Sequence, residues 1–184
     1  MVSRARHRPT PSHHVTSASA DLLPDLLVPD LDLVFCGTAA GKASAAAGAY
    51  YAHPQNRFWQ ALHESGLTER RFAPAEFPAL LDVGLGLTDL AKKVFGNDDE
   101  LGRGHFDVDG LVAKIEHFRP GILAFTSKAA AKAFLHVGAV DYGLQDRSVG
   151  GTRLFVLPSP SGAASGHWSL EPWRQLAGLR KACR

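Results

Sequence analysis

The stretch Leu31-Asp-Leu-Val-Phe-Cys36, followed at once by Gly37, decides the fold of this chain. A short apolar run that stops at a glycine is typical of a strand buried inside a sheet. Comparable runs at residues 121–125 and 153–157 predict two more strands, and residues 85–88 predict a fourth, although glycines interrupt it. The sequence therefore predicts a sheet of four strands.

Helical patterns fill the segments between these strands. Ser127 and Ser169 stand where a hydroxyl can cap the first turn of a helix. Strands that alternate with helices predict a three-layer α/β fold around a central, mostly parallel, four-stranded sheet. The segments expected to be helical are residues 56–65, 74–82, 108–118, 128–135 and those after Ser169.

Composition fits an ordinary globular protein. The chain has 184 residues, of which 45% are hydrophobic and 21% charged, and we expect one domain over residues 21–184 that needs no metal or disulfide staple. The formal net charge of +2 is too small to argue for a nucleic-acid partner by itself. No apolar run approaches the roughly 20 residues needed to span a bilayer.

The ends of the chain and its cysteines bear on location. Residues 1–20 are basic and rich in Ser, His and Pro, which predicts a disordered tail, although an Arg- and Ser-rich start also resembles a transit peptide. Only Cys36 and Cys183 are present, and Cys36 sits in an apolar run. This usage fits the reducing cytoplasm of a bacterium, with the protein at the nucleoid if it binds DNA.

A ligand site is expected where two strands end. A Gly- and Ala-rich loop follows Cys36 and runs to about Pro54, and a second loop follows Leu157. In open α/β sheets, ligands bind outside the carboxyl ends of the strands. The two loops should therefore meet at one site.

Four motifs in these segments carry a family resemblance. They resemble, in order and spacing, motifs of the mismatch-specific uracil and thymine DNA glycosylases, in the uracil-DNA glycosylase superfamily, over roughly residues 24–182. The motifs are Gly37-Thr-Ala-Ala-Gly41, Tyr50-Tyr-Ala-His-Pro-Gln-Asn-Arg-Phe-Trp59, Gly84-Leu-Gly-Leu-Thr-Asp-Leu90 and Leu157-Pro-Ser-Pro-Ser-Gly162.

The resemblance implies an enzyme that flips uracil out of DNA and hydrolyses its N-glycosidic bond. It implies a uracil-type pocket at the strand ends, no metal, no cofactor and no membrane. No lysine stands out as a Schiff-base nucleophile, so we expect a monofunctional enzyme that leaves an abasic site. DNA is the expected partner of a monomer with no obligate protein partner.

The resemblance also assigns residues to the base. Main-chain N–H groups around Gly37, Thr38 and Ala39 would stabilise the anionic leaving base. Tyr51, just before Ala-His-Pro, would stack on the flipped base, and Ser44 would touch its edge. Where relatives have Asn before Pro-Ser-Gly, this chain has Ser159, which would alter contacts to the flipped nucleotide. Residues 56–59 are expected to begin and pack a helix behind the pocket.

The first motif departs from the family at the catalytic position. Relatives position the attacking water with an Asn, and Ala39 stands there instead. A methyl group cannot orient water, so Asp89 is the candidate replacement, as a carboxylate that holds water and stabilises positive charge on the sugar. The alternative is a surface Asp paired with Lys92 or Lys93.

The fourth motif, Leu157 to Gly162, and the residues after it would provide most of the expected DNA contacts. Ser161 and nearby main-chain N–H groups would hold phosphate, with Lys42 as a further backbone contact and Lys92, Lys93 and Lys128 as others. His167 would lie near DNA, unless His167 and Trp168 are simply an exposed and a packed side chain. Relatives carry a bulky wedge in this segment, where this chain has small residues, so we expect weak discrimination of the opposite base. The residues of this segment expected to contact DNA are Gly162, Ala163, Ala164 and Ser165.

Three functions remain open from the sequence. The first is excision of uracil from single- and double-stranded DNA. The second is excision of a deaminated purine such as hypoxanthine or xanthine. The third is lesion binding without catalysis, which Ala39 favours.

Overall fold

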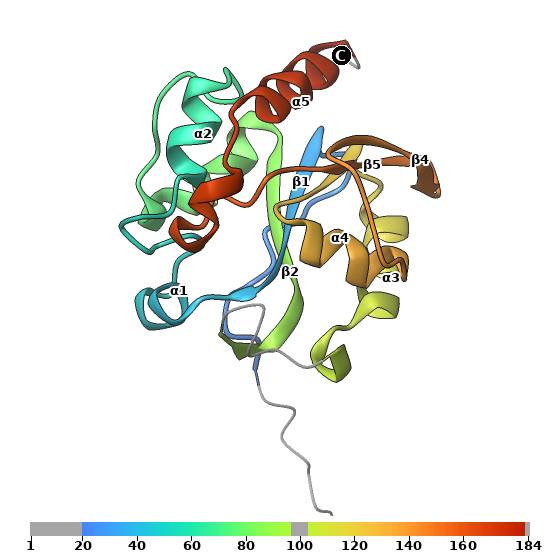
Figure 1. Cartoon of the computed structure of the whole chain (residues 1–184), viewed down its shortest axis with the longest axis horizontal. Helices are drawn as coiled ribbons and strands as arrows, with labels where there is room; N and C mark the ends of the chain where they lie inside the picture. The colour runs from blue at the N-terminus through green and yellow to red at the C-terminus, as the bar shows by residue number, and fades with distance from the viewer. Residues whose placement is uncertain (1–19, 97–102, 183–184) are drawn as a thin grey trace, which may run out of the picture.

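A computed structural model describes residues 20–96 and 103–182, and the predicted tail falls almost entirely outside this range. Figure 1 shows one twisted sheet with helices on both faces. The strands are β1 (Leu33–Ala40), β2 (Leu85–Phe95), β3 (Ile122–Phe125), β4 (Gly143–Val149) and β5 (Thr152–Val156). The helices are α1 (Lys42–Ala47), α2 (Phe58–Glu64), α3 (Val108–Phe118), α4 (Lys128–Leu135) and α5 (Glu171–Lys181), with 3-10 helices η1 (Pro74–Val83), η2 (Arg103–His105) and η3 (Gly162–His167).

The sheet has the strand order β2-β1-β3-β5-β4. Its first four strands are parallel, and β4 runs antiparallel to β5. The α/β fold and mostly parallel sheet are confirmed, but the count of four strands is wrong by one. The missed strand, β4, lies at the edge and is largely exposed, so its sequence, GLQDRSV, lacks the apolar run that marks a buried strand.

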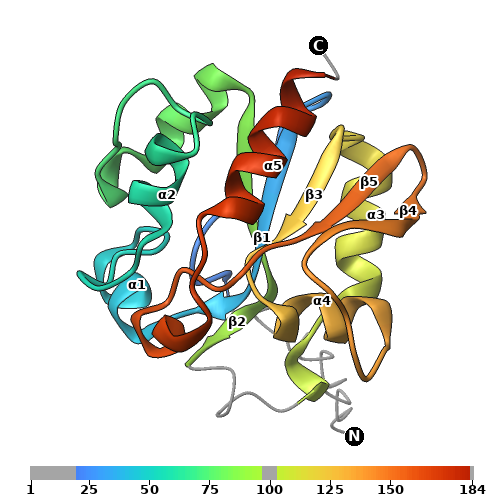
Figure 2. The same cartoon turned by 45° about the horizontal axis from the view of Figure 1, so that its top comes forward.

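Side chains from alternate residues of the strands pack into two separate hydrophobic cores. Leu33 and Phe35 face the core beneath η1, α2 and α5, whereas Val34 and Cys36 face the core beneath α3 and α4. Successive side chains of a strand point to opposite faces, so a central strand covered on both faces must be apolar throughout. The layers on either side of the sheet are clear in Figure 2.

The predicted helices are confirmed with small shifts at their ends. Ser127 caps α4 by accepting a hydrogen bond of 3.0 Å from the N–H of Ala130. The hydroxyl of Ser169 accepts a 3.3 Å hydrogen bond from the N–H of Glu171 at the start of α5. Each serine therefore satisfies a main-chain donor that the helix itself leaves open.

Two expectations about the first half of the chain are corrected. The Gly- and Ala-rich segment is not all loop, because β1 continues to Ala40 and α1 follows it. The helix-forming alanines of α1 carry no large apolar stripe, which is why periodicity missed it. Strand β2 also continues seven residues beyond Thr88, so Asp89 lies within a strand and not at its end.

The strand pairing opens a crevice at one end of the sheet. Strand β1 pairs with β3 only as far as Cys36, whereas its pairing with β2 continues to Ala40. Residues 37–40 therefore border a gap on the β3 side. In both views α1 and the η3 segment lie together beside this end of β1 (Figures 1 and 2). Within the described residues, no helix is long and apolar enough to cross a membrane.

Candidate active site

A cavity of about 790 Å³ lies at the carboxyl end of β1. It brings together both glycine-containing loops that the sequence placed at the strand ends, so the predicted meeting of these loops is confirmed. Its walls include the end of β1, α1, the segment before α2, part of β2 and the loop after β5. Among the residues predicted to act in the site, the lining contains Gly37, Thr38, Ala39, Lys42, Ser44, Tyr51, Asp89, Ser159, Ser161, Gly162, Ala163 and Ala164.

Asp89 is the carboxylate of this cavity. It is directly opposite Gly37 in the β1–β2 register, and its side chain is 6% exposed. A Cβ atom built on Gly37 would lie 2.5 Å from Oδ1 of Asp89 and 3.5 Å from the hydroxyl of Tyr51. Gly37 is therefore required by space, because any larger residue would push the carboxylate away.

Burial dominates the electrostatics of the Asp89 carboxyl group. Burial raises its pKa to about 7, an effect that the positive charge of Lys92 opposes and the negative charge of Asp25 reinforces. Among the described residues, none forms a hydrogen bond or ion pair with the Asp89 carboxylate. A carboxyl group with a pKa near neutrality can accept or release a proton at working pH.

Lys92 does not pair with Asp89, contrary to the surface alternative raised from the sequence. Its side chain is 8% exposed, and its ammonium group lies 2.8 Å from Oδ1 of Asp25 and donates a 3.0 Å hydrogen bond to the hydroxyl of Tyr50. The expected DNA contact by Lys92 is therefore wrong, because the group is buried and already paired. Its positive charge still acts on Asp89 through space.

Asp25 is held by three donors. Lys92 and Lys114 form ion pairs with it at 2.8 and 2.5 Å, and the Thr88 hydroxyl donates at 2.7 Å. Burial alone would raise the pKa of Asp25, but the hydrogen bonds from Lys114 and Lys92 outweigh it and leave that pKa lowered. The ion pairs and the hydrogen bond thus favour the ionised form of Asp25.

Tyr51 occupies the wall facing the end of β1. One face of its ring stacks on Phe58, with 3.9 Å between centroids and 16° between planes, so only the opposite face remains for a base. Its hydroxyl shares a 3.2 Å hydrogen bond with that of Thr126. The backbone of Tyr51 has φ of 52°, in the left-handed region that non-glycine residues seldom adopt. Such strain is typical of residues held in place at functional sites.

Ser44 is buried in α1 and braces the Tyr51 segment. Its hydroxyl oxygen accepts a 3.1 Å hydrogen bond from the N–H of Ala52. The hydroxyl proton remains available to a ligand in the cavity, which Ser44 lines. A bracing role is therefore established by the contact, and a role at the edge of a base stays a prediction.

The loop after β5 is locked against the segment before α2. The N–H of Arg57 donates a 2.8 Å hydrogen bond to the carbonyl of Pro160. A Cβ atom on Gly162 would come within 2.8 Å of Cβ of Gln55, so glycine is needed for this close approach. Within the loop, Ser159 Oγ accepts from the N–H of Ser161 at 3.3 Å. The two motifs therefore form one continuous wall.

The residues beyond Gly162 divide into exposed and packed side chains. Ala163 and His167 are exposed, Ala164 is half-buried, and Ser165 belongs to η3. Trp168 packs against the core, 6.0 Å from the ring of Trp173. The packed tryptophan and exposed histidine of the plainer alternative are confirmed, and a DNA contact by His167 stays a prediction.

Residues 56–59 hold the wall behind Tyr51. The side-chain oxygen of Asn56 accepts a 2.9 Å hydrogen bond from the N–H of Phe58, where α2 begins, and Phe58 and Trp59 are buried. The predicted structural role of this segment is confirmed.

Sequence reasoning missed Asp25, Lys114 and Thr126. Asp25 acts on Asp89 from 64 positions earlier in the sequence, in a segment before the first strand with no recognisable motif. Thr126 follows β3 directly and could have been found as a polar residue at a strand end. Lys114 stands on α3, whose pattern gives no sign of its partner.

The comparisons with known proteins identify the family and the fold. A family model of the uracil DNA glycosylase superfamily matches residues 24–178, so the chain belongs to that superfamily, whose members act in DNA repair as glycosylases. The fold is similar to the solution NMR structure of a candidate uracil DNA glycosylase from Methanosarcina acetivorans. The TM-score is 0.62, with 20% sequence identity over 89% of this chain and 98% of that chain.

Proposed function

We propose that this protein is a monofunctional DNA glycosylase of the mismatch-specific type, which removes uracil from single- and double-stranded DNA and leaves an abasic site. The observation that carries the proposal is the Asp89 carboxylate, which is buried beside Gly37 in a cavity at the strand ends and has no partner among the described residues. Leaving an acid unpaired in such a place costs stability, which favours a catalytic use.

The flipped base would enter between Tyr51 and the end of β1. A base inside a duplex is out of reach, so flipping must come first, at a cost of a few kcal/mol. The free face of Tyr51 would stack on the base, and main-chain N–H groups of residues 37–39 would stabilise the negative charge that it carries away. Losing one such donor typically costs about 10²–10³ in rate.

Asp89 would act on the sugar and the water. As the N-glycosidic bond breaks, the bonding electrons leave with the base and C1′ gains positive charge, which the ionised carboxylate stabilises. Water then bonds to C1′ and passes a proton to Asp89. This role needs the carboxylate form, so excision should rise with pH through the region near 7, where Asp89 ionises.

The DNA strand would be held at the loop after β5. Ser161 and the neighbouring main-chain N–H groups would bind phosphate. The small side chains from Ala163 to Ser165 fill a vacated base stack poorly, so we expect uracil to be removed from several pairs and from single strands. A strict preference for mismatches over single-stranded uracil would contradict this expectation.

A deaminated purine is the second candidate substrate. A pKa of about 7 leaves part of Asp89 protonated at neutral pH, and a carboxylic acid can donate a proton to a leaving purine. Excision of hypoxanthine that falls as pH rises through 7 would favour this candidate. Excision of uracil that rises over the same range would favour the first.

The test is incubation of the protein with labelled single- and double-stranded oligonucleotides that carry uracil, hypoxanthine or xanthine, followed by alkali. Strand breaks that depend on the modified base, and disappear with Asp89→Asn, would support the proposal. Binding to damaged DNA with no breaks on any substrate would instead support lesion recognition without catalysis, the function that Ala39 favours.

A further inference from the structure

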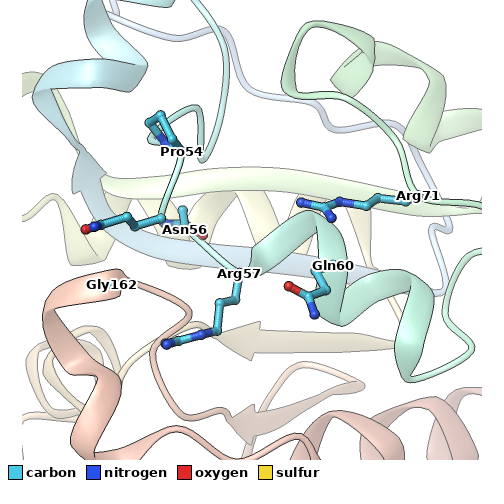
Figure 3. Close-up of a pocket in the computed structure, with 7 residues that line it drawn as sticks. Pro54, Asn56, Arg57, Gln60, Arg71 and Gly162 are labelled. Atoms are coloured by element: carbon cyan, nitrogen blue, oxygen red, sulfur yellow. The ribbon is translucent and has the colours of Figure 1, made fainter.

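A second pocket lies outside the cavity that contains Asp89, on the other side of the wall formed by the two interlocked loops. Its volume is about 460 Å³, and every side chain that lines it is neutral or positively charged. Its lining residues are Pro54, Gln55, Asn56, Arg57, Gln60, Arg71 and Gly162. In Figure 3, Arg71 reaches toward Asn56 and Gln60, while Arg57 extends from the start of α2 toward the segment of Gly162.

Arg57 is unusually placed for a guanidinium group. Its Cζ atom lies 5.5 Å from the centroid of the Trp168 ring, which supports the group from one side. Its Nη1 atom is buried and has no hydrogen-bond partner among the described residues. Buried donors are almost always satisfied, so this one needs an acceptor that water or a ligand in the pocket can supply.

Arg71 differs from Arg70 in its ion pairing. Arg70 forms an ion pair of 2.9 Å with Glu76, whereas no ion pair joins Arg71 to a described residue. Arg71 is exposed and faces the same pocket as Arg57. A guanidinium group without an ion-pair partner among the described residues, beside the Gln55 and Asn56 amides that line the same pocket, matches the charge and hydrogen-bonding needs of a phosphate group.

We propose that this arginine pocket binds a backbone phosphate of the DNA strand whose base occupies the cavity. Gln55, Asn56 and Gly162 line both spaces, so the pocket adjoins the cavity directly. A strand that places one nucleotide in the cavity must carry its neighbouring phosphates across this shared wall. The proposal rests on the proposed function only in taking DNA as the ligand.

The experiment measures binding, which does not depend on excision. A duplex with a tetrahydrofuran abasic site is bound by the wild type, Arg71→Gln and the matched control Arg70→Gln, which removes the same charge one residue outside the pocket. Each phosphate flanking the site is replaced in turn by an uncharged methylphosphonate. Because Arg71 is exposed, its replacement should leave the fold intact.

The expected result is one linkage at which the methylphosphonate weakens wild-type binding about tenfold. The same substitution should have no further effect on Arg71→Gln, whose salt dependence of log K should also be shallower by about 1. Arg70→Gln should behave as the wild type at every linkage. If Arg71→Gln instead behaves as Arg70→Gln throughout, the pocket does not bind DNA.

A titration with inorganic phosphate distinguishes a free anion from a DNA phosphate. Phosphate that shifts the indole NMR signal of Trp168 in the wild type and not in Arg71→Gln, with no linkage coupled to Arg71, would overturn the DNA proposal in favour of a free anion. A coupled linkage together with no excision of any base would leave this proposal standing and remove the proposed activity. The two failures are therefore distinguishable.

Discussion

Two carboxylates near Lys92 have opposite fates in this molecule. Asp25 takes ion pairs from two lysines and a hydrogen bond from Thr88, and its pKa is lowered. Asp89 lies deeper, has no direct partner among the described residues, and its pKa is raised to about 7. The first arrangement stabilises a charge, whereas the second keeps a carboxyl group at the edge of ionisation, facing a cavity.

The difference between Asp25 and Asp89 lies in how many donors surround each carboxyl group. A buried carboxylate can be made stable by surrounding it with donors, and the chain does this for Asp25. The same lysine that pairs with Asp25 could have been directed at Asp89 and is not. The unpaired burial of Asp89 costs stability, which is what the proposed catalytic role would require.

The largest effect is expected from Asp89→Asn. Loss of the carboxylate should lower the rate of excision about 10²–10⁴-fold, the usual range for a catalytic base. Affinity for DNA with an abasic analogue should stay within about twofold, because the pocket and loops keep their shape. Single-turnover excision and binding by fluorescence anisotropy measure the two quantities separately.

Thermal stability provides the control for this variant. A carboxyl whose pKa rises on folding destabilises the protein progressively as pH increases from its unfolded pKa to its folded pKa, here from 3.8 to about 7. Asp89→Asn removes that penalty, so it should unfold at a higher temperature than the wild type above pH 7 and lose this advantage near pH 4. A variant that is less stable at both pH values would mean that its loss of excision reflects misfolding.

The next largest effect is expected from Gly37→Ala. A methyl group there would lie 2.5 Å from Oδ1 of Asp89, so the carboxylate must move. A displacement of about 1 Å can reduce rate about 10²-fold, and we expect a loss of that size in excision with the carboxylate still present.

Gly41→Ala is the matched control, since a Cβ atom on Gly41 has no neighbour within 4 Å. It should retain most of the excision rate. Equal losses in the two glycine variants would show that the position of Asp89 is not what Gly37 secures.

A smaller, directional effect is expected on the pH profile. The positive charge of Lys92 lowers the pKa of Asp89 and the negative charge of Asp25 raises it. Lys92→Met should therefore move the acidic limb of the excision rate to higher pH, and Asp25→Asn should move it to lower pH. Single-turnover rates between pH 5 and 9 measure both shifts.

These two variants also test how the lysine is used. Shifts in the same direction would show that loss of the buried ion pair rearranges the site and that charge is not the controlling factor. Asp25→Asn should in addition reduce stability, because the buried Lys92 ammonium group loses its counter-ion. The midpoint of urea unfolding measures this loss.

The sequence predicts the parts of this molecule that local chemistry controls. Apolar runs predict β1, β3 and β5, and the motif from Tyr50 to Trp59 predicts one wall of the cavity. The edge strand β4 was missed because its side chains are mostly exposed, and α1 because alanines give no amphipathic stripe. Both elements bury few large apolar side chains, so neither leaves a periodic hydrophobic pattern in the sequence.

Ion pairs between distant residues are the second feature that the sequence does not predict. Asp89 could be selected from its motif, but the pairing of Lys92 with Asp25 depends on a packing that no spacing in the sequence reveals. The pocket of Arg57 and Arg71 has the same origin, since the loop of Gly162 completes it from the far end of the chain. Contacts between segments that are distant in the sequence determine which charged groups form ion pairs and which face a pocket without one.

The smallest effect is expected from Ala39→Asn in the Asp89→Ala background, which restores the amide of the family pattern that the first motif resembles. Ala39 follows Gly37 by two residues on β1, so its side chain lies on the same face of the sheet as that of Asp89, and both line the cavity. An amide at position 39 could hold water where the carboxylate no longer does. We expect it to restore excision about tenfold over Asp89→Ala, well short of the wild type, because one neutral group replaces a charge.

The control is Ala39→Leu in the same background, which adds similar bulk without a polar atom and should restore nothing. Equal recovery with leucine would mean that filling space accounts for the effect, whereas recovery with asparagine alone would show that Asp89 has taken over the task of the missing amide from the neighbouring strand.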